Sequence, residues 1–394
     1  MATVRAYGAL VSFLSAAALF ALTGCGSGGD GEAAGETGGS GGGSNGGSSG
    51  GGTSGSGGSS GSGNSGGTGS GTPSGRILWT VSSFLPTLRG LDTGSHEVVL
   101  EVPIVDLAES DVAINTMAIS DEQVWLARDD GHLAVVDRNA EEVVAEVDLT
   151  PFGESENINI YHVALADGYA FSSPEYNIQP PIVRIDASTF EVVTQADILD
   201  GVGYPTGIIH DGTDLWIMQW NAIELLRVDP ATLEVRARVA LGQDPEEPDT
   251  FGEFYGYGYM ADSGDTLWVI DTASLRLLSI DKATLTPRAV ADLSDLTDFE
   301  TYLEFDANSR GVFLLLDEPG IVVRFDPRTG ERVDTYDFST DGGVGTMAVG
   351  SDHVYVTPGG SAFVYGAREI DLDTGRVAQI IASDVAINNI GVQK

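Results

Sequence analysis

Short apolar segments alternate with polar turns along residues 76–394, and the same order of segments recurs seven times. Each repeat has an inner segment, an aromatic and aliphatic strand, a strand that ends in Asp, a tight turn and a Val-rich strand. The second of these strands reads ILWTV from Ile77 in the first repeat and HVYVT from His353 in the last. Short apolar runs bounded by turn residues indicate antiparallel strands, and helical periodicity is nearly absent. The pattern predicts an all-β domain built from repeated four-stranded units.

One aspartate marks the end of the third strand in every repeat. The intervals between these aspartates, 43 to 52 residues, suit one four-stranded propeller blade per repeat. An Asp followed by Pro or a small polar residue and then Thr is typical of turns in which the carboxylate accepts backbone N–H groups. We therefore interpret them as turn residues rather than as a functional set. The seven are Asp92, Asp137, Asp186, Asp229, Asp281, Asp326 and Asp371.

The two ends of the repeat region complement each other. The final residues, DVAINNIGVQ from Asp384, repeat the inner-strand segment DVAINTMAIS from Asp111, but no second strand follows them. At the other end, Arg76 leads directly into a second strand with no inner strand before it. Pairing the last strand with the first blade would close the sheet ring and remove an open edge. The sequence therefore predicts a seven-bladed β-propeller whose first blade is completed by the C-terminal strand.

The first 75 residues have a different composition. Residues 1–24 hold Arg5 and then an uncharged apolar run, which is typical of a secretory signal peptide. A membrane-spanning helix is the alternative, but the run is shorter than the roughly 20 apolar residues that a span needs. Residues 26–75 are almost only Gly, Ser, Thr and Asn, so we expect a disordered tether.

The sequence Leu22-Thr23-Gly24-Cys25 resembles the lipobox of bacterial lipoproteins, in which the signal is cut before a cysteine that is then acylated. Cys25 is the only cysteine in the chain, so no internal disulfide can form. The resemblance implies anchoring to a lipid bilayer through acylated Cys25. It also implies a place in the cell envelope, with the outer membrane favoured because Gly26 rather than Asp follows the cysteine. An incidental free cysteine is the alternative.

The formal net charge is −39, and the folded part carries most of it. Without Arg5, Asp30, Glu32 and Glu36, 18 basic and 55 acidic residues remain. A surface with this charge repels nucleic acid and anionic lipid headgroups, so we expect neither as a partner. Solubility alone accounts for the charge, and attraction of cations or basic partners is the other interpretation.

Long connections that follow the fourth strands carry the best candidates for ligand binding. In a propeller these connections share one face with those between second and third strands, and loops longer than the repeat needs commonly carry function. The longest runs from Leu241 and combines five acids with five aromatic rings, a composition that suits a sugar, a peptide or a basic ligand. Packing of the rings and solvation of the acids is an equal alternative. The loop from Ser172 to Pro181 and the turn Gln219-Trp220-Asn221 add more rings and amides at this mouth. The predicted starts of the inner strands would line the channel, and they are polar and nearly uncharged. The candidates from these strand starts are Asn115, Tyr161, His162, Tyr257, Tyr302 and Asn388, and those from the loops are Trp220, Glu253 and Tyr255.

No arrangement of catalytic or metal-ligating residues stands out. The five histidines fall in different repeats, and only His162 falls near the predicted mouth, so no transition-metal site and no cofactor are predicted. Nothing marks a nucleophile elbow either. Some propeller lyases and lactone hydrolases combine His and Glu with a divalent cation. His162 with Glu156 or Glu253 is the corresponding alternative here.

The phrases VYVT from Val354, VVRFDPRTGERV and LLRVDPATLEV resemble the YVTN-type repeat propellers of bacterial secreted and surface proteins. The resemblance covers 76–394 and implies the fold more strongly than any activity, because binding proteins and enzymes share it. We expect a monomeric, non-catalytic binding module for a protein, peptide or carbohydrate. A cation-dependent lyase or lactonase-like enzyme is the alternative.

Overall fold

The computed structural model describes residues 77–81, 87–104, 112–153, 158–175, 180–199, 205–219, 224–241, 260–271, 275–296, 303–317, 319–339, 344–358, 365–387 and 389–392. All of them belong to one compact unit, residues 69–394. The signal peptide, Cys25 and the tether lie outside the described residues, so these predictions stay predictions. No helix in the described ranges has the length and hydropathy of a membrane span.

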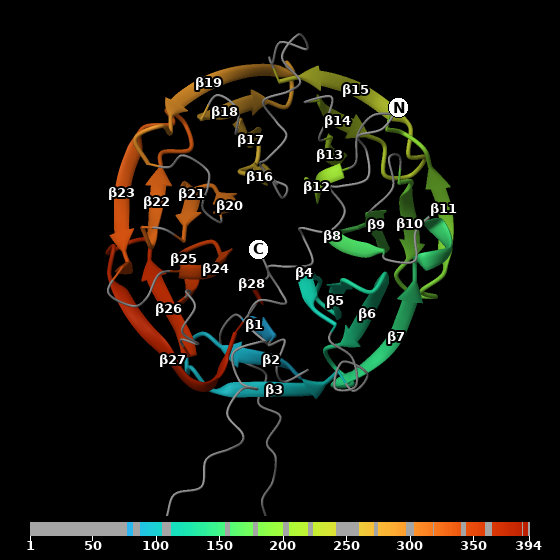
Figure 1. Cartoon of the computed structure of the whole chain (residues 1–394), viewed down its shortest axis with the longest axis horizontal. Coiled ribbons are helices and arrows are strands. Elements are labelled where there is room, and N and C mark those ends of the chain that lie inside the picture. Colours follow the sequence, from blue (N-terminus) through green and yellow to red (C-terminus); the bar gives the residue numbers. More distant parts are fainter. Residues whose placement is uncertain are drawn as a thin grey trace, which may run out of the picture. The chain divides into compact units, whose positions relative to one another are not determined.

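The unit is a ring of seven four-stranded antiparallel sheets, so the predicted seven-bladed propeller is confirmed (Figure 1). Within each sheet the strand nearest the ring axis pairs with the next strand outward, and so on to the rim. One short 3-10 helix, η2 (Thr150–Phe152), follows the fourth strand of blade 2. Second strands are almost completely buried and mostly apolar on both faces, whereas outer strands largely alternate between exposed and partly buried residues, as a sheet edge at the rim requires.

From the axis outward, the strands are as follows. Blade 1 has β28 (Asn389–Val392), β1 (Ile77–Val81), β2 (Thr87–Asp92) and β3 (Val98–Pro103); blade 2 has β4 (Ile114–Ile119), β5 (Gln123–Arg128), β6 (His132–Asp137) and β7 (Glu142–Asp148); blade 3 has β8 (Asn159–Ala166), β9 (Tyr169–Glu175), β10 (Ile182–Asp186) and β11 (Val192–Ala196); blade 4 has β12 (Pro205–His210), β13 (Leu215–Gln219), β14 (Glu224–Val228) and β15 (Val235–Ala240). Blade 5 has β16 (Met260–Asp262), β17 (Thr266–Asp271), β18 (Arg276–Asp281) and β19 (Thr286–Asp292); blade 6 has β20 (Leu303–Asn308), β21 (Gly311–Leu316), β22 (Ile321–Phe325) and β23 (Arg332–Asp337); blade 7 has β24 (Val344–Val349), β25 (His353–Pro358), β26 (Tyr365–Asp371) and β27 (Val377–Ala386).

The C-terminal strand completes blade 1, as predicted. β28 pairs antiparallel with β1, and Trp79 lies opposite Gly391. The closing strand is shorter than the repeated segment suggested, because Asp384 to Ala386 form the end of β27 and β28 begins only at Asn389. The side chain of Ile390 is 5% exposed and packs in a cluster with Leu78. Both ends of the described chain therefore share one hydrophobic core.

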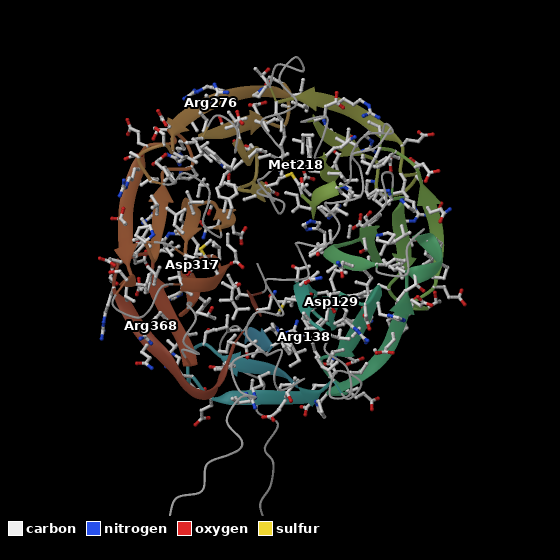
Figure 2. All side chains as sticks on the ribbon, viewed as in Figure 1. Asp129, Arg138, Met218, Arg276, Asp317 and Arg368 are labelled. Carbon is white, nitrogen blue, oxygen red and sulfur yellow. The ribbon has the colours of Figure 1, made fainter. Side chains whose placement is uncertain are left out.

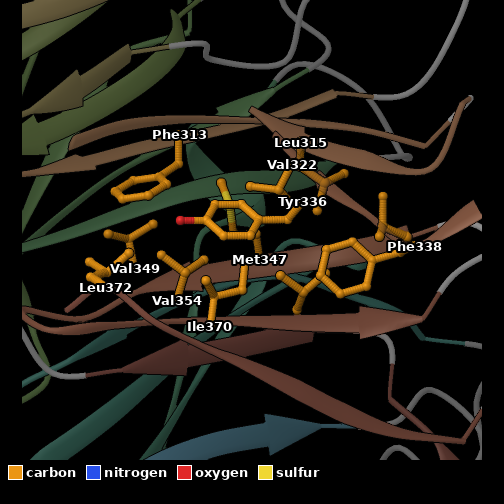
Figure 3. Close-up of a cluster of buried hydrophobic side chains, with 12 residues drawn as sticks. Phe313, Leu315, Val322, Tyr336, Phe338, Met347, Val349, Val354, Ile370 and Leu372 are labelled. Atoms are coloured by element: carbon orange, nitrogen blue, oxygen red, sulfur yellow. The ribbon is translucent and has the colours of Figure 1, made fainter. Parts of the chain in front are cut away.

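Seven hydrophobic clusters fill the seven interfaces between neighbouring blades. Each second strand sends one aromatic side chain into the interface with the following blade, and the residues two positions apart on that strand face the same way. Figure 3 shows the cluster between blades 6 and 7, where Phe313 packs with residues of both sheets. Every blade thus depends on both neighbours for burial of its sheet faces. The seven aromatics are Trp79, Trp125, Phe171, Trp216, Trp268, Phe313 and Tyr355.

All seven marker aspartates make the predicted turn bonds. In the first turn the Asp92 Oδ1 atom accepts from the amides of Gly94 and Ser95 at 2.9 and 2.8 Å, and the other six turns repeat this pair of bonds. The residue four positions after each aspartate has a positive φ. It is Gly330 and Gly375 in the last two blades and a non-glycine residue in the other five. The turn carboxylates are therefore structural.

The two ends of the ring differ in the length of their connections. First-to-second and third-to-fourth strand turns lie at one end, here called the short-turn end, and span two to six residues each. Connections from one blade to the next lie at the other end, the long-loop end, with those between second and third strands. The longest of these spans residues 241–259, between β15 and β16.

Candidate functional site

Three of the nine predicted ligand-binding residues fall in the described part of the chain: Asn115, Tyr161 and His162. All three lie on first strands near the ring axis, toward the long-loop end. The other six lie outside the described residues and stay predictions: Trp220, Glu253, Tyr255, Tyr257, Tyr302 and Asn388.

Asn115 links three blades around the axis. Its side-chain Nδ2 donates to the carbonyl of Ile160 in blade 3 at 2.9 Å. Its own carbonyl accepts from the side-chain Nδ2 of Asn389 in blade 1 at 3.0 Å. The amide donor of Asn115 is therefore used to hold neighbouring first strands together, and Asn389 performs the same task across the closing seam.

Tyr161 and His162 occupy an irregularity in the pairing of β8 with β9. Ile160 lies opposite Pro174 and Val163 opposite Ser172, so Tyr161 and His162 together face the single residue Ser173. The Tyr161 hydroxyl accepts from the Asn159 side-chain amide at 3.1 Å. The His162 residue is partly exposed but its Nε2 atom is buried, and burial lowers its pKa to about 4. His162 is therefore neutral at physiological pH.

Glu304 is a carboxylate that the sequence did not single out among the first strands. Its Oε1 accepts from the Thr346 hydroxyl at 2.7 Å, and its Oε2 accepts from the Met347 amide. These bonds join β20 to β24, so the charge is used between blades 6 and 7. Glu304 is therefore a charged and hydrogen-bonded residue at the start of a first strand, where the sequence predicted polar and nearly uncharged residues.

Two buried polar residues at the long-loop end were not among the nine candidates. Gln219 is 1% exposed and Ser173 is 2% exposed. Within the described part of the chain, the nitrogen and the oxygen of the Gln219 side-chain amide have no hydrogen-bond partner, and the Ser173 hydroxyl has none either. The sequence placed Gln219 in a turn and Ser173 in a loop from Ser172 to Pro181, whereas the structure places both in strands. A polar residue at the end of an apolar run can belong either to the strand or to the following turn, and the local sequence does not distinguish these two placements.

The described ranges contain no cluster of side chains suited to binding a metal ion. No group of three or more His, Cys, Asp or Glu side chains there is arranged to hold a metal ion. The partners proposed for His162 in the cation-dependent alternative, Glu156 and Glu253, lie outside the described residues, so that alternative stays a prediction.

Comparison with known proteins identifies the fold but no family. No family model matches the chain, and no curated protein matches it. Among solved structures, it is similar to a functionally unknown protein from Desulfotomaculum acetoxidans DSM 771, with a TM-score of 0.57 and 13% identity over 80% of this chain and 98% of that chain. It is also similar to the dihydro-heme d1 dehydrogenase NirN in complex with DHE, with a TM-score of 0.53 and 15% identity over 78% of this chain and 64% of that chain. The beta-propeller domain of Cps50 (Swd1) from Myceliophteria thermophila has a TM-score of 0.47 and 13% identity, over 67% of this chain and 85% of that chain.

These likenesses bear on architecture alone. At identities of 13–15%, residues of these proteins cannot be matched one by one to residues of this chain. The DHE bound to NirN therefore indicates nothing about a ligand of this chain. Since 1503 solved chains match, the architecture is widespread and does not specify one activity. What this chain binds or does therefore has to be argued from the site.

Proposed function

We propose that this chain is a lipid-anchored protein of the cell envelope whose propeller binds a protein, peptide or carbohydrate at the long-loop end. The difference between the two ends of the ring is the observation that supports it. Turns of two to six residues close one end, whereas 19 residues connect β15 to β16 at the other. A rigid scaffold with long loops on one side is the usual construction of a binding protein.

The composition of those loops supports a polar ligand. Residues 241–259 carry acids and aromatic rings side by side, including Glu253, Tyr255 and Tyr257. Rings stack on sugar faces and on apolar side chains, while carboxylates accept hydrogen bonds from hydroxyls, amides or basic groups. Tyr161 and neutral His162 lie on β8 toward the same end. The net charge of −39 adds an attraction for basic ligands and a repulsion of anionic ones.

A binding panel with a matched control variant tests the ligand-binding part. Full-length protein, a variant with Glu253, Tyr255 and Tyr257 all changed to Ala, and a control would be applied to arrays of glycans and of basic peptides. The control changes Glu97, Glu122 and Asp265 to Ala, three exposed acids in turns of the short-turn end. A ligand held by the wild type and the control but lost by the loop variant is the expected result. Equal loss in both variants, or retention by the loop variant, would show that the long loops are not the site.

Membrane fractionation tests the anchor. Cys25→Ser should move the protein from the membrane to the soluble fraction, because removal of the acyl chains removes about 0.8 kcal/mol of membrane affinity per buried CH₂. Metabolic labelling with a fatty acid should mark the wild type and not the variant. Membrane association that survives Cys25→Ser would contradict the lipoprotein assignment and leave the binding assignment untouched.

A further inference from the structure

Gln219 is the last residue of the second strand of blade 4. It differs in its hydrogen bonding from the residues at the equivalent position of other blades. In blade 2 the position holds Arg128, which donates from Nε to Asp130 at 3.0 Å. In blade 5 it holds Asp271, which accepts from Arg276 at 3.0 Å. In blade 6 it holds Leu316, which packs in the core. Only in blade 4, among these four described positions, is the side chain polar, buried and without a described partner.

The side chain of Gln219 faces blade 3. Leu215 and Ile217 alternate with it along β13, and both belong to the cluster between blades 3 and 4. Met218, one residue earlier, lies toward the inner part of its blade in Figure 2, far from the rim where Arg276 and Arg368 lie. Gln219 therefore lies inside the interface, on the second strand from the ring axis, at the long-loop end.

Ser173 faces the same interface from the opposite wall. Phe171, two residues earlier on β9, packs in the cluster between blades 3 and 4, so Ser173 points the same way. His162 lies opposite Ser173 in the irregular pairing of β8 and β9. Two blades thus contribute uncharged hydrogen-bonding groups to the long-loop end of the same interface.

The charged residue opposite Gln219 is already paired. Glu224 lies opposite Gln219 on β14, and it pairs with Arg238 at 3.2 Å. Arg238 also donates to the carbonyl of Ile198 in blade 3 at 3.2 Å. The bond from Arg238 to Ile198 spans the interface on the outer side of Gln219. The carboxylate beside Gln219 therefore presents no uncompensated charge to a ligand.

Buried polar groups without partners are rare, and each one costs stability unless water or a ligand satisfies it. We propose that the long-loop end of the interface between blades 3 and 4 binds a small neutral group that carries a donor and an acceptor side by side, with Gln219 and Ser173 as its direct partners. A primary or secondary amide has this chemistry, and so do adjacent sugar hydroxyls. The inference rests on the proposed function in that it names the ligand chemistry at one position of the long-loop end.

Ligand-observed NMR with four small probes tests the proposal on the full-length Cys25→Ser protein. Acetamide supplies the amide, glucose the hydroxyl pairs, N-acetylglucosamine both, and acetate is the charged counterpart of acetamide. At least one neutral probe should bind, acetate should not, and Gln219→Met should weaken the binding at least tenfold. Ser173→Ala gives the same readout if Gln219→Met does not fold. Gln195→Met, the same change at an exposed position on β11, is the matched control.

Urea unfolding of the probe-free proteins gives an independent readout. Replacing an amide that has no protein partner by an apolar side chain of similar size should leave the unfolding midpoint unchanged or raise it. A lower midpoint for Gln219→Met would mean that a loop already satisfies the amide, and would overturn the proposal. Absence of binding by all three neutral probes, binding that survives Gln219→Met, or equal binding of acetate would overturn it as well. If only the Glu253, Tyr255 and Tyr257 variant loses a larger ligand, the proposed function stands without this site.

Discussion

Closure of the ring by β28 predicts a large loss of stability from one substitution near the C-terminus, Ile390→Ala. The Ile390 side chain is 5% exposed and packs between blades 7 and 1, with Leu78 and Tyr355 among its neighbours. The substitution removes three carbons, which is about 2.5 kcal/mol of transfer free energy at about 0.8 kcal/mol per carbon. The cavity left behind adds to this, so we expect a loss of about 3 to 4 kcal/mol. That is a large share of the roughly 5–15 kcal/mol by which a domain is stable.

Urea unfolding followed by tryptophan fluorescence measures this loss, because four of the five tryptophans are fully buried in blade interfaces. Val333→Ala is the matched control, since Val333 lies on outer strand β23 and is 50% exposed. Its cost should stay below about 1 kcal/mol. If Ile390→Ala costs no more than Val333→Ala, β28 contributes no packing to the ring and the closure described above is wrong.

Three further predictions concern turns, acid and a buried charge. Glu141 has a φ of 57°, a left-handed backbone conformation that is strained for a residue with a Cβ atom. Glu141→Gly should therefore raise the unfolding free energy by up to about 1 kcal/mol in urea titration, and a decrease would contradict this backbone strain. Burial lowers the pKa of His162 to about 4. At Asp211 burial acts to raise the pKa, but hydrogen bonds from Asp214, Trp216 and Lys282 lower it to about 2. Since both groups have a lower pKa when folded, the urea midpoint should be highest above pH 6.5. It should fall from there to about pH 4 through His162, then toward pH 2 through Asp211, and a flat profile would refute this. Asp214→Asn should cost about 3 kcal/mol because this fully buried carboxylate holds two arginines, whereas exposed Asp373→Asn should cost almost nothing; equal urea midpoints would contradict it.

Strand content, blade number and the closing strand follow from local chemistry. Apolar second strands, Asp turns and the repeated terminal segment each act within a few residues, so the sequence alone predicts them. Asp92 and its six counterparts show this most clearly, because an Asx turn needs only the amides two and three residues further on. Candidates such as Asn115 were placed correctly on first strands for the same reason.

Only the tertiary structure decided which side chains meet. Whether Gln219 belongs to a turn or to a buried strand end depends on packing against blade 3, which lies in another repeat. Likewise, His96 of blade 1 is far in sequence from Glu369 of blade 7, yet ring closure brings its Nε2 atom to 3.9 Å from Glu369, which also lies 3.1 Å from His353 of its own blade. A repeat pattern fixes the path of each blade through local turns and alternation. The contacts between blades depend on ring closure, which brings together residues that no local pattern connects.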